Sequence, residues 1–412
     1  MLLSEVLGTS VRDAGGHAMG RLRDVVASIE GVEPPRIVGL LLRRDGADLF
    51  VPIGYVATLD AQGVTMRGEL PVLTSFVRRP HEALLGRDVM DSQVISLAGP
   101  RVVRVSDVML AKDGSDWRLA GVDSGARALL SRLLPRALRP RGDRAPIIPW
   151  MQIELISSEI PGGLVPPEHR RLARLHPADI ARVADAMPAR QATEIVASLD
   201  DELAADTMEE MIDAKQADVI EELEPERAAD ILDCMAPDAA ADVLAELEPE
   251  VVDKVLRRMD PAEAADVHAL LTYPHNTAGG LMSTDYVMAP RGMRVGDTLD
   301  HLRPQLEKPD LVYYVYVVED EQDRRLRGVF SLRGFLLAEG TQRVDDIMVT
   351  ELRRVTPETS AAAVAQTMSE YNLMALPVTD AEGRLLGVVS VDDALEVVLP
   401  ADLRRRVPRI FS

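Results

Sequence analysis

The stretch LEPERAADILDCMAPDAAADVLAELEPE, residues 223–250, decides the fold of the central part of the chain. A large apolar residue recurs every 12 positions, at Leu223, Met235 and Leu247, and a proline follows each of them two residues later. One straight helix cannot use this spacing, because 12 steps of about 100° turn its apolar face by about 120° per repeat. Proline is tolerated at the first position of a helix, where its missing N–H would have no partner. The pattern therefore predicts one short helix per 12 residues.

The same period covers residues 175–271, which makes eight units. The large apolar positions in this register are Leu175, Met187, Leu199, Met211, Leu223, Met235, Leu247, Met259 and Leu271. Units taken in pairs would form 24-residue helical hairpins, and hairpins of this kind stack on their neighbours. We therefore predict a small α-solenoid.

Carboxylates follow the register of this helical repeat. Three pairs lie four residues apart, on one face of a predicted helix: Glu202/Asp206, Glu226/Asp230 and Asp238/Asp242. Like charges at that spacing destabilise a helix by about 0.2–0.5 kcal/mol per pair. One interpretation is a solvated acidic face, whose early carboxylates are favoured by helix N-termini. The other is a surface whose repulsion is relieved by a divalent cation. Mg²⁺ fits the second interpretation, because it accepts one or two carboxylates and keeps several waters.

Composition limits the class of protein. The 412 residues allow two to four domains, and the net charge of −21 argues against nucleic acid and favours cations or basic partners. Cys234 is the only cysteine, which fits a reducing compartment. Residues 1–20 lack the pattern of a signal peptide, and no window approaches the roughly 18 apolar residues of a membrane span. We therefore expect a cytoplasmic protein without a transmembrane segment.

Residues 1–122 predict a β domain. Short apolar runs such as Ile37–Leu42 and Leu49–Ile53 alternate with Gly, Pro and Asp turns. Two stretches are echoed later in the same domain: Leu7–Asp13 by Leu85–Asp91, and Arg21–Val25 by Arg104–Val108. The echo predicts two similar small barrels or one barrel doubled. The Gly8-x-x-Val11-x-Asp13 strand, with its Gly turn and Asp-Val strand, resembles the PRC-barrel family. That resemblance implies a non-catalytic β-barrel with a protein or RNA partner.

Residues 123–170 predict a linker that is rich in arginine and proline. Its arginines are Arg127, Arg132, Arg136, Arg139, Arg141 and Arg144. One interpretation is a solvated connector. The other is a basic strap that docks on the acidic domain or on anionic lipid. A second basic segment, residues 401–412, forms the tail of the chain.

The helical repeat runs into YPHNTAGGLMS, residues 273–283. This junction resembles that of MgtE-type magnesium channels, where a helical N-domain meets paired CBS domains. The resemblance implies an N-domain at residues 171–276 and a CBS pair at 277–400 that close around bound Mg²⁺. It places the Mg²⁺-binding carboxylates at Glu194, Glu226, Asp230, Asp393 and Glu396. Relatives continue into a membrane pore where this chain ends, so we do not expect it to conduct ions by itself.

The CBS resemblance rests on two copies of one plan, at residues 277–339 and 344–400. Each copy ends on the same step, GVFSLRG at 328–334 and GVVSVDD at 387–393. The resemblance implies a homodimer formed through the CBS domains.

The CBS resemblance also implies a cleft for an adenine nucleotide, with Tyr314, Arg333 and Asp393 as candidate binding residues. A ribose diol needs a bidentate acceptor; Asp393 supplies one, whereas Gly334, at the matching position of the first copy, does not. Tyr314 could equally be a core residue, and Arg333 could pair with an acidic neighbour.

Two positions depart from the MgtE pattern: Ala361 and Asn372 stand where relatives tend to carry carboxylates. Two functions remain open. The first is a non-catalytic regulatory protein that senses Mg²⁺ through the acidic helices and the CBS pair. The alternative is an interaction adaptor in which the β domain recruits the partner and the repeat is a scaffold. We do not expect an enzyme, because the histidines are scattered and we find no phosphate-binding glycine loop or nucleophile elbow.

Overall fold

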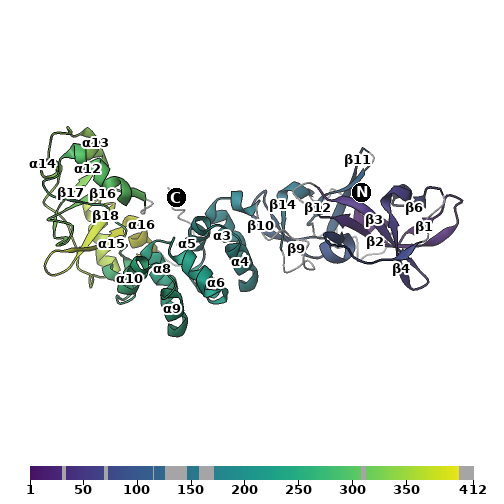
Figure 1. Ribbon diagram of the computed structural model, residues 1–412, viewed down its shortest axis with the longest axis horizontal. Coiled ribbons are helices and arrows are strands. Elements are labelled where there is room, and N and C mark those ends of the chain that lie inside the picture. Colours follow the sequence, from purple (N-terminus) through teal and green to yellow (C-terminus); the bar gives the residue numbers. More distant parts are fainter. Residues whose placement is uncertain are drawn as a thin grey trace. The chain divides into compact units, whose positions relative to one another are not determined.

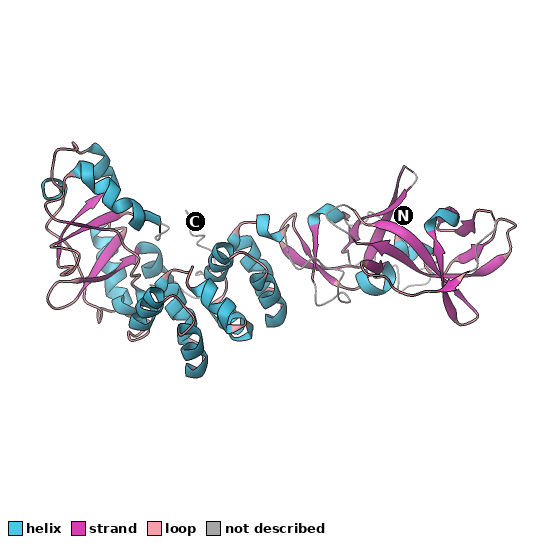
Figure 2. Cartoon of the chain, viewed as in Figure 1, coloured by secondary structure: helices cyan, strands magenta, loops and turns pink. Residues whose placement is uncertain are grey.

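The computed structural model describes residues 1–29, 34–68, 73–114, 116–125, 146–156, 171–307 and 312–398, with the backbone alone for 396–398. The chain packs as two compact units, Met1–Asp200 and Asp201–Ser412. Figure 1 follows the elements along the chain, and Figure 2 shows strands in the first part, short helices in the middle and a mixed region at the end. The multidomain α+β class is confirmed.

The first unit begins with a β-sheet region. Its elements are α1 (Leu3–Val6), β1 (Ser10–Arg12), β2 (Ala18–Ser28), β3 (Arg36–Arg44), β4 (Ala47–Pro52), η1 (Ile53–Tyr55), β5 (Val56–Asp60), β6 (Gly63–Met66), β7 (Thr74–Ser75), β8 (Glu82–Leu84), η2 (Leu85–Val89), β9 (Gln93–Ser96), β10 (Arg101–Arg104), β11 (Asp107–Asp113), β12 (Asp116–Asp123), β13 (Ile148–Pro149), η4 (Trp150–Gln152) and β14 (Ile153–Leu155). The main sheet has the order β11-β12-β3-β2-β1-β6-β5, and β10-β9-β14 form a second sheet. Among the described strands, no path closes into the expected barrel.

The β-sheet region repeats one plan twice. The hairpin β1–β2 pairs Ser10 with Arg21, and the hairpin β9–β10 pairs Gln93 with Arg104 in the same register. The echo of Arg21–Val25 in Arg104–Val108 agrees with this register. The echo of Leu7–Asp13 in Leu85–Asp91 does not, because Leu85–Val89 form η2 and the strand that matches β1 is β9.

Two further antiparallel strand pairs follow the same plan. Gly39 of β3 pairs with Pro52 of β4, and Gly121 of β12 pairs with Pro149 of β13. A Cβ on Gly39 would lie 2.3 Å from the Phe50 ring, and one on Gly121 would lie 2.3 Å from a backbone oxygen. Both positions therefore require glycine for the same reason.

Each half contributes its first residues to the sheet of the other half. Leu84 of β8, which opens the second half, pairs with Val26 of β2. In return, Leu2 of the first half bridges to Met109 of β11. The two halves are thus exchanged, and neither completes its sheet alone.

The stretch expected to be a linker differs from a simple connector. Within 123–170, β13 pairs with β12 and β14 pairs with β9, so residues 148–155 complete the second half of the sheet region. Trp150 lies in the core, 4% exposed. It belongs to the same hydrophobic core as Val122 and Ile153. The six arginines of the predicted strap and the tail 401–412 lie outside the described residues.

Eight short helices follow: α3 (Pro177–Asp185), α4 (Ala189–Ala197), α5 (Asp201–Glu209), α6 (Asp213–Glu222), α7 (Pro225–Leu232), α8 (Pro237–Ala245), α9 (Pro249–Leu256) and α10 (Pro261–Leu270). Each begins 12 residues after the one before, and α3, α7, α8, α9 and α10 carry proline in the first turn. In the second unit α5 packs on α7, α7 on α9, α6 on α8 and α8 on α10. The prediction of one short helix per 12 residues is confirmed.

The remaining elements form two modules with one plan. The first holds α11 (Ala278–Leu281), β15 (Met288–Pro290), α12 (Val295–Leu302), η7 (Arg303–Glu307), β16 (Tyr314–Val318), β17 (Leu326–Ser331) and α13 (Leu332–Leu337). The second holds α14 (Val344–Ile347), α15 (Ala361–Tyr371), β18 (Ala375–Thr379), β19 (Leu385–Ser390) and α16 (Val391–Val398). Tyr314 pairs with Ser331, and Ala375 pairs with Ser390, so the two copies share one register. No helix in the described ranges has the length and apolarity needed to cross a membrane.

Candidate functional site

Several carboxylates of the helical repeat hold the helices together. The Oε1 atom of Glu209 accepts a hydrogen bond from the backbone N–H of Ala236 at 2.8 Å. One 24-residue period later, the carboxylate of Asp233 accepts from the backbone N–H of Asp260 at 3.0 Å. Both acceptors satisfy an N–H at the start of a helix three units further on, where an orphan donor needs a partner. These acids are structural.

Two of the predicted metal-binding carboxylates lie on α7. The Arg258 Nε donates to Oε1 of Glu226 at 2.7 Å, and this hydrogen bond is the main cause that lowers the pKa of Glu226. Asp230 is exposed, and its charge contributes to the raised pKa of Asp233, after burial and the charges of Asp260 and Glu263. Glu226 is therefore already neutralised by an arginine.

Two others lie apart from α7. Glu194 lies on α4, in the first unit, with its Oε1 3.9 Å from Nε of Arg190. Glu396 lies on α16, and its side chain is outside the described part of the chain.

Asp238, the second residue of α8, has a different environment. Its Oδ1 atom is shielded from solvent and finds no hydrogen-bond partner among the described residues. Burial, then the charge of Asp393, raises the pKa of Asp238 to about 8, and the charge of Glu209 adds to the shift. A hydrogen bond with the Ser283 side chain opposes the shift but does not cancel it. Asp238 and Asp393 are thus two carboxylates in electrostatic contact, one from the helical repeat and one from the second module.

Asp393 is fixed by the start of α16. The Ser390 hydroxyl donates to Oδ2 of Asp393 at 2.5 Å and accepts from the backbone N–H of Asp393 at 3.2 Å. In the first module, Ser331 accepts from the backbone N–H of Gly334 at 3.1 Å, and glycine at that position carries no carboxylate. The two modules therefore share the helix cap and differ in the acid.

The junction between repeat and modules positions this carboxylate pair. Ser283 exchanges two backbone hydrogen bonds with Val388 of β19, at 2.9 and 3.0 Å. The backbone N–H of Ala278 donates to Thr359 at 2.7 Å. A Cβ on Gly280 would lie 2.4 Å from the Pro274 backbone oxygen, so the chain can turn there only with glycine. The segment that follows the repeat is thereby bound to the second module, the one that carries Asp393.

Two of the three candidate nucleotide residues lie on the first module, and the third, Asp393, lies on α16 of the second. Tyr314 begins β16 and is half-buried beside Tyr316, while Arg333 is exposed on α13. Tyr316 is 3% exposed, its hydroxyl has no partner among the described residues, and burial raises the pKa of that hydroxyl. Tyr314 contributes to the cluster between the modules, so its core interpretation also has support.

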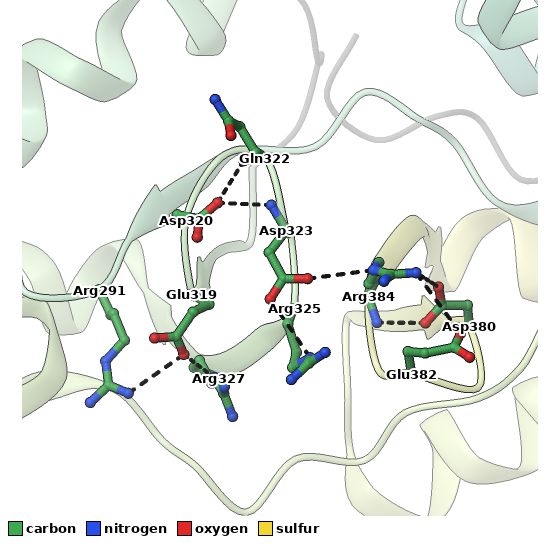
Figure 3. Close-up of polar contacts among 10 residues, drawn as sticks. All are labelled: Arg291, Glu319, Asp320, Gln322, Asp323, Arg325, Arg327, Asp380, Glu382 and Arg384. Carbon is green, nitrogen blue, oxygen red and sulfur yellow. Dashed lines mark hydrogen bonds and ion pairs between the residues drawn. The ribbon is translucent and has the colours of Figure 1, made fainter.

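Charged turns join the two modules at their edge. Figure 3 shows Arg384 of the second module reaching Asp323 of the first at 3.4 Å, while it also pairs with Asp380 at 3.4 Å. In the first module Arg327 and Arg291 both contact Glu319, at 2.5 and 3.6 Å. The ion pair between Arg384 and Asp323 joins the turns of the two modules.

In the described part of the chain, no three His, Cys, Asp or Glu side chains gather closely enough to form a metal cluster. The carboxylate pair of Asp238 and Asp393 still suits one kind of cation. Mg²⁺ binds through one or two carboxylates and keeps its remaining waters. A buried, unpaired carboxylate oxygen beside a second carboxylate is a donor set that such an ion fits.

Sequence reasoning placed Asp238 in the acidic register but did not single it out as a ligand. Its neighbours in that register are also acidic, and only the fold distinguishes a buried oxygen from an exposed one. Asp238 follows a proline, but so do Glu226 and Glu250, so the proline is no signal of a site.

The fold and this contact define a helical repeat coupled to a pair of β–α modules. Comparison with known proteins gives these regions names. The sequence profile of the MgtE intracellular N domain matches residues 175–276, and that of the CBS domain matches residues 344–400. The chain therefore carries an MgtE N domain followed by a CBS domain.

The magnesium transporter MgtE of Thermus thermophilus is 42% identical over 134 residues, which is 32% of this chain and 29% of the transporter. The chain thus spans less than a third of the length of the curated relatives it matches. A crystal structure of the cytosolic domain of the Mg²⁺ channel MgtE in complex with ATP is 35% identical, with a TM-score of 0.52. The aligned region covers 55% of this chain and 92% of the chain in that structure. The soluble part of a magnesium transporter is similar at 30% identity and a TM-score of 0.52, over 56% of this chain and 90% of that one.

Proposed function

We propose that this protein is a non-catalytic regulatory protein that senses Mg²⁺ between its helical repeat and its second CBS domain. The observation that carries the proposal is the buried, unpaired Oδ1 of Asp238 beside Asp393. Asp238 and Asp393 would hold the ion, which supplies two positive charges where two negative ones meet. The likeness to the cytosolic domain of an Mg²⁺ channel supports the same ion.

The response follows from the electrostatics of the pair. Without a cation, ionised Asp238 and Asp393 repel, and α8 is favoured in place only while a proton neutralises Asp238. With a cation, both carboxylates stay ionised and α8 remains docked. The cation therefore substitutes for a proton, and the fraction of molecules with α8 docked increases with the Mg²⁺ concentration.

The other predicted ligands remain proposals. Glu194, Glu226, Asp230 and Glu396 would bind further ions on the outer face of the repeat. At Glu226 such an ion must displace Arg258, which donates at 2.7 Å. We therefore place the primary ion at Asp238.

The test is a Mg²⁺ titration of the full chain, followed by calorimetry and by protection from protease at the repeat–CBS junction. Mg²⁺ should bind and protect the wild type, and Asp238→Asn should lose both effects. Asp253→Asn is the matched control, because Asp253 is an exposed acid on α9 that pairs only loosely with Arg257, at 3.7 Å. The proposal fails if the wild type shows no change up to about 10 mM Mg²⁺, well above the dissociation constants of oxygen-ligand sensor sites.

Three further proposals come with this function. The CBS pair would form a homodimer, measurable as molar mass by light scattering. The protein would lie in the cytoplasm. An adenine nucleotide would bind between Tyr314, Arg333 and Asp393, as the ATP complex of the similar cytosolic domain suggests.

The β-sheet region supports a second candidate function, an interaction adaptor. Residues 1–156 lie outside the stretches that the MgtE and CBS profiles match, and their doubled plan agrees with a duplicated PRC-like domain. This region would recruit a protein or RNA partner. A pull-down should use residues 1–156, because a fragment ending at 122 would remove β13 and β14 from the sheets. Failure of that fragment to retain a partner that the full chain retains would count against the adaptor.

A further inference from the structure

The segment that joins the helical repeat to the CBS domains carries a histidine beside the repeat. His275 follows α10, and α10 packs on α8. The Nδ1 atom of His275 lies 2.9 Å from Oδ1 of Asp242, the sixth residue of α8. His275 is exposed and Asp242 is half-buried, so the contact is open to protons from the solvent. This hydrogen bond ties the connecting segment to the helical repeat through two side chains.

The residues that follow the histidine are tied to the second CBS domain instead. The backbone N–H of Gly279 donates to the carbonyl of Pro357 at 2.9 Å. The bond from the N–H of Ala278 to the carbonyl of Thr359 lies next to it. Both bonds join backbone atoms, and the residue between the two acceptors is Glu358, an exposed acid. The histidine therefore stands between α8 and the loop that leads into α15.

Acidic groups face His275 from two helices of the repeat. Asp242 lies on α8, and Glu246 ends the same helix four residues later. Asp213 begins α6, which packs on α8. The negative charges of all three carboxylates act on His275. Other bases of the repeat pair with other acids, as Arg258 does with Glu226.

This environment favours the protonated imidazole. The hydrogen bond with Asp242 raises the pKa of His275, burial lowers it, and the three negative charges raise it again, so that the net shift is upward. Histidine changes its charge near neutral pH, and a modest shift moves that change across the physiological range. A protonated imidazole donates a charge-assisted hydrogen bond to Asp242, and it relieves the repulsion between Asp242 and Glu246, which lie one helical turn apart. The contact is therefore strongest while His275 carries its proton.

We propose that His275 and Asp242 form a proton-dependent latch that fastens the helical repeat to the second CBS domain. Asp242 is not one of the carboxylates proposed to hold Mg²⁺, so the latch stands independently of that function. Because the pKa of His275 is raised in the folded protein, the latch contributes fully below the unfolded-state pKa of about 6.5 and is lost as pH rises through the folded-state value. The junction loosens as the solution becomes more alkaline.

The experiment follows the full chain, free of metal, by NMR from about pH 5.5 to 8.5, a range that brackets the ordinary histidine pKa. The imidazole signal of His275, assigned by its absence in His275→Gln, should titrate above that ordinary value. Protection of the Ala278 and Gly279 amides from hydrogen exchange, corrected for the intrinsic effect of pH, should fall with the same midpoint. The expected fall is about threefold, the size of a partly exposed ion pair.

Two variants break the latch in different ways. His275→Gln keeps a hydrogen-bonding side chain that cannot take up a proton, and amide protection should lose its pH dependence. Asp242→Asn keeps the shape of the side chain without its charge, and the pKa of His275 should fall. His268→Gln is the matched control, because His268 is an exposed histidine on α10, and it should keep the full pH dependence.

A third variant separates the latch from the other group of this junction whose pKa is raised. Asp238→Asn removes that carboxyl, and the fall in amide protection with the midpoint of His275 should remain. The latch is disproved if His275 titrates at the ordinary histidine value or if Asp242→Asn leaves its pKa unchanged. It is equally disproved if amide protection depends on pH as strongly in His275→Gln as in the wild type.

Discussion

The β-sheet region and the repeat–CBS junction each bury a carboxylate oxygen, and the hydrogen bonding of the two oxygens differs. Asp24 on β2 is 6% exposed, and its Oδ1 accepts from the backbone N–H of Val25 and of Gly86, both at 2.7 Å. Asp238 on α8 has a buried Oδ1 with no partner among the described residues. A buried polar group that is satisfied stabilises a fold, whereas one left open costs free energy. The open one is therefore where a ligand is expected.

The hydrogen bonds of Asp24 also help to join the two halves of the sheet region. Asp24 belongs to the first half and binds Gly86 of the second, while Asp107 of the second half accepts from Ser4 of the first at 3.1 Å. Asp107 is 1% exposed, and burial raises its pKa against the bonds from Ser4 and Val108. Each half thus holds the first residues of the other.

The largest effect should come from breaking this lock. Asp24→Ala leaves two backbone N–H groups without an acceptor and should cost about 3 kcal/mol of unfolding free energy, measured by denaturant titration. Asp60→Ala is the matched control, because Asp60 also accepts two backbone N–H groups but in an exposed turn. Equal losses in the two variants would mean that burial does not matter at Asp24.

Asp238→Asn should raise the free energy of unfolding, whereas Asp24→Ala should lower it. The change removes the repulsion from Asp393 and keeps the shape of the side chain, so the metal-free protein should gain roughly 1 kcal/mol, the size of one net hydrogen bond. The same denaturant titration measures it. A loss of several kcal/mol would show that Asp238 is satisfied and structural, like Asp24.

The pKa values of Asp24 and Asp238 should differ as well. Burial raises the pKa of Asp24 to about 6 and that of Asp238 to about 8. For a raised carboxyl pKa, the stabilising contribution is full below the unfolded value near 4 and is lost as pH rises through the folded value. Metal-free docking of α8 should therefore weaken between pH 4 and pH 8, and Mg²⁺ binding should release a proton below pH 8.

Proton release is measured by calorimetry of Mg²⁺ binding in buffers of different ionisation enthalpy. Asp238→Asn should abolish the release, while Asp24→Asn should not affect it. A release that persists without Asp238 would place the titrating group elsewhere.

The structural acids of the repeat should give a smaller effect. Glu209→Ala removes the acceptor of the Ala236 N–H and should cost about 1 kcal/mol, as loss of a helix cap does. Glu222→Ala, an exposed acid on α6, should leave the unfolding midpoint unchanged. A silent Glu209→Ala would mean that water replaces the bond.

The smallest effect is expected at the exposed pair of Glu226 and Arg258. Exposed ion pairs contribute little, so Arg258→Ala should leave the unfolding midpoint where it is. It should, however, free Glu226 for a cation and increase the number of Mg²⁺ ions bound. No additional ion in that variant would remove Glu226 from the set of ligands.

Sequence patterns predicted the structure best in the helical repeat and the two modules, where a single local rule decides the fold. The 12-residue period predicted the helices correctly, because proline opens five of the eight units and is tolerated only in the first turn of a helix. The matching steps GVFSLRG and GVVSVDD likewise predicted two modules of one plan. Both are local signals, readable without knowledge of what lies across the fold.

Long-range features were out of reach. The strands β13 and β14 lie in an Arg- and Pro-rich stretch, and only their pairing with β12 and β9 shows that they complete the second half. Asp238 is one of many acids in register, and the charge that most raises its pKa after burial is that of Asp393, which is far away in sequence. Burial and partnership are set by tertiary contacts, so a periodic acidic pattern cannot single out the one acid that matters.

A crystal structure of the full chain grown with Mn²⁺ in place of Mg²⁺ tests the central claim most directly. The account predicts an anomalous peak between the carboxylates of Asp238 and Asp393, with water completing the coordination. A structure with no ion between these two carboxylates would contradict it.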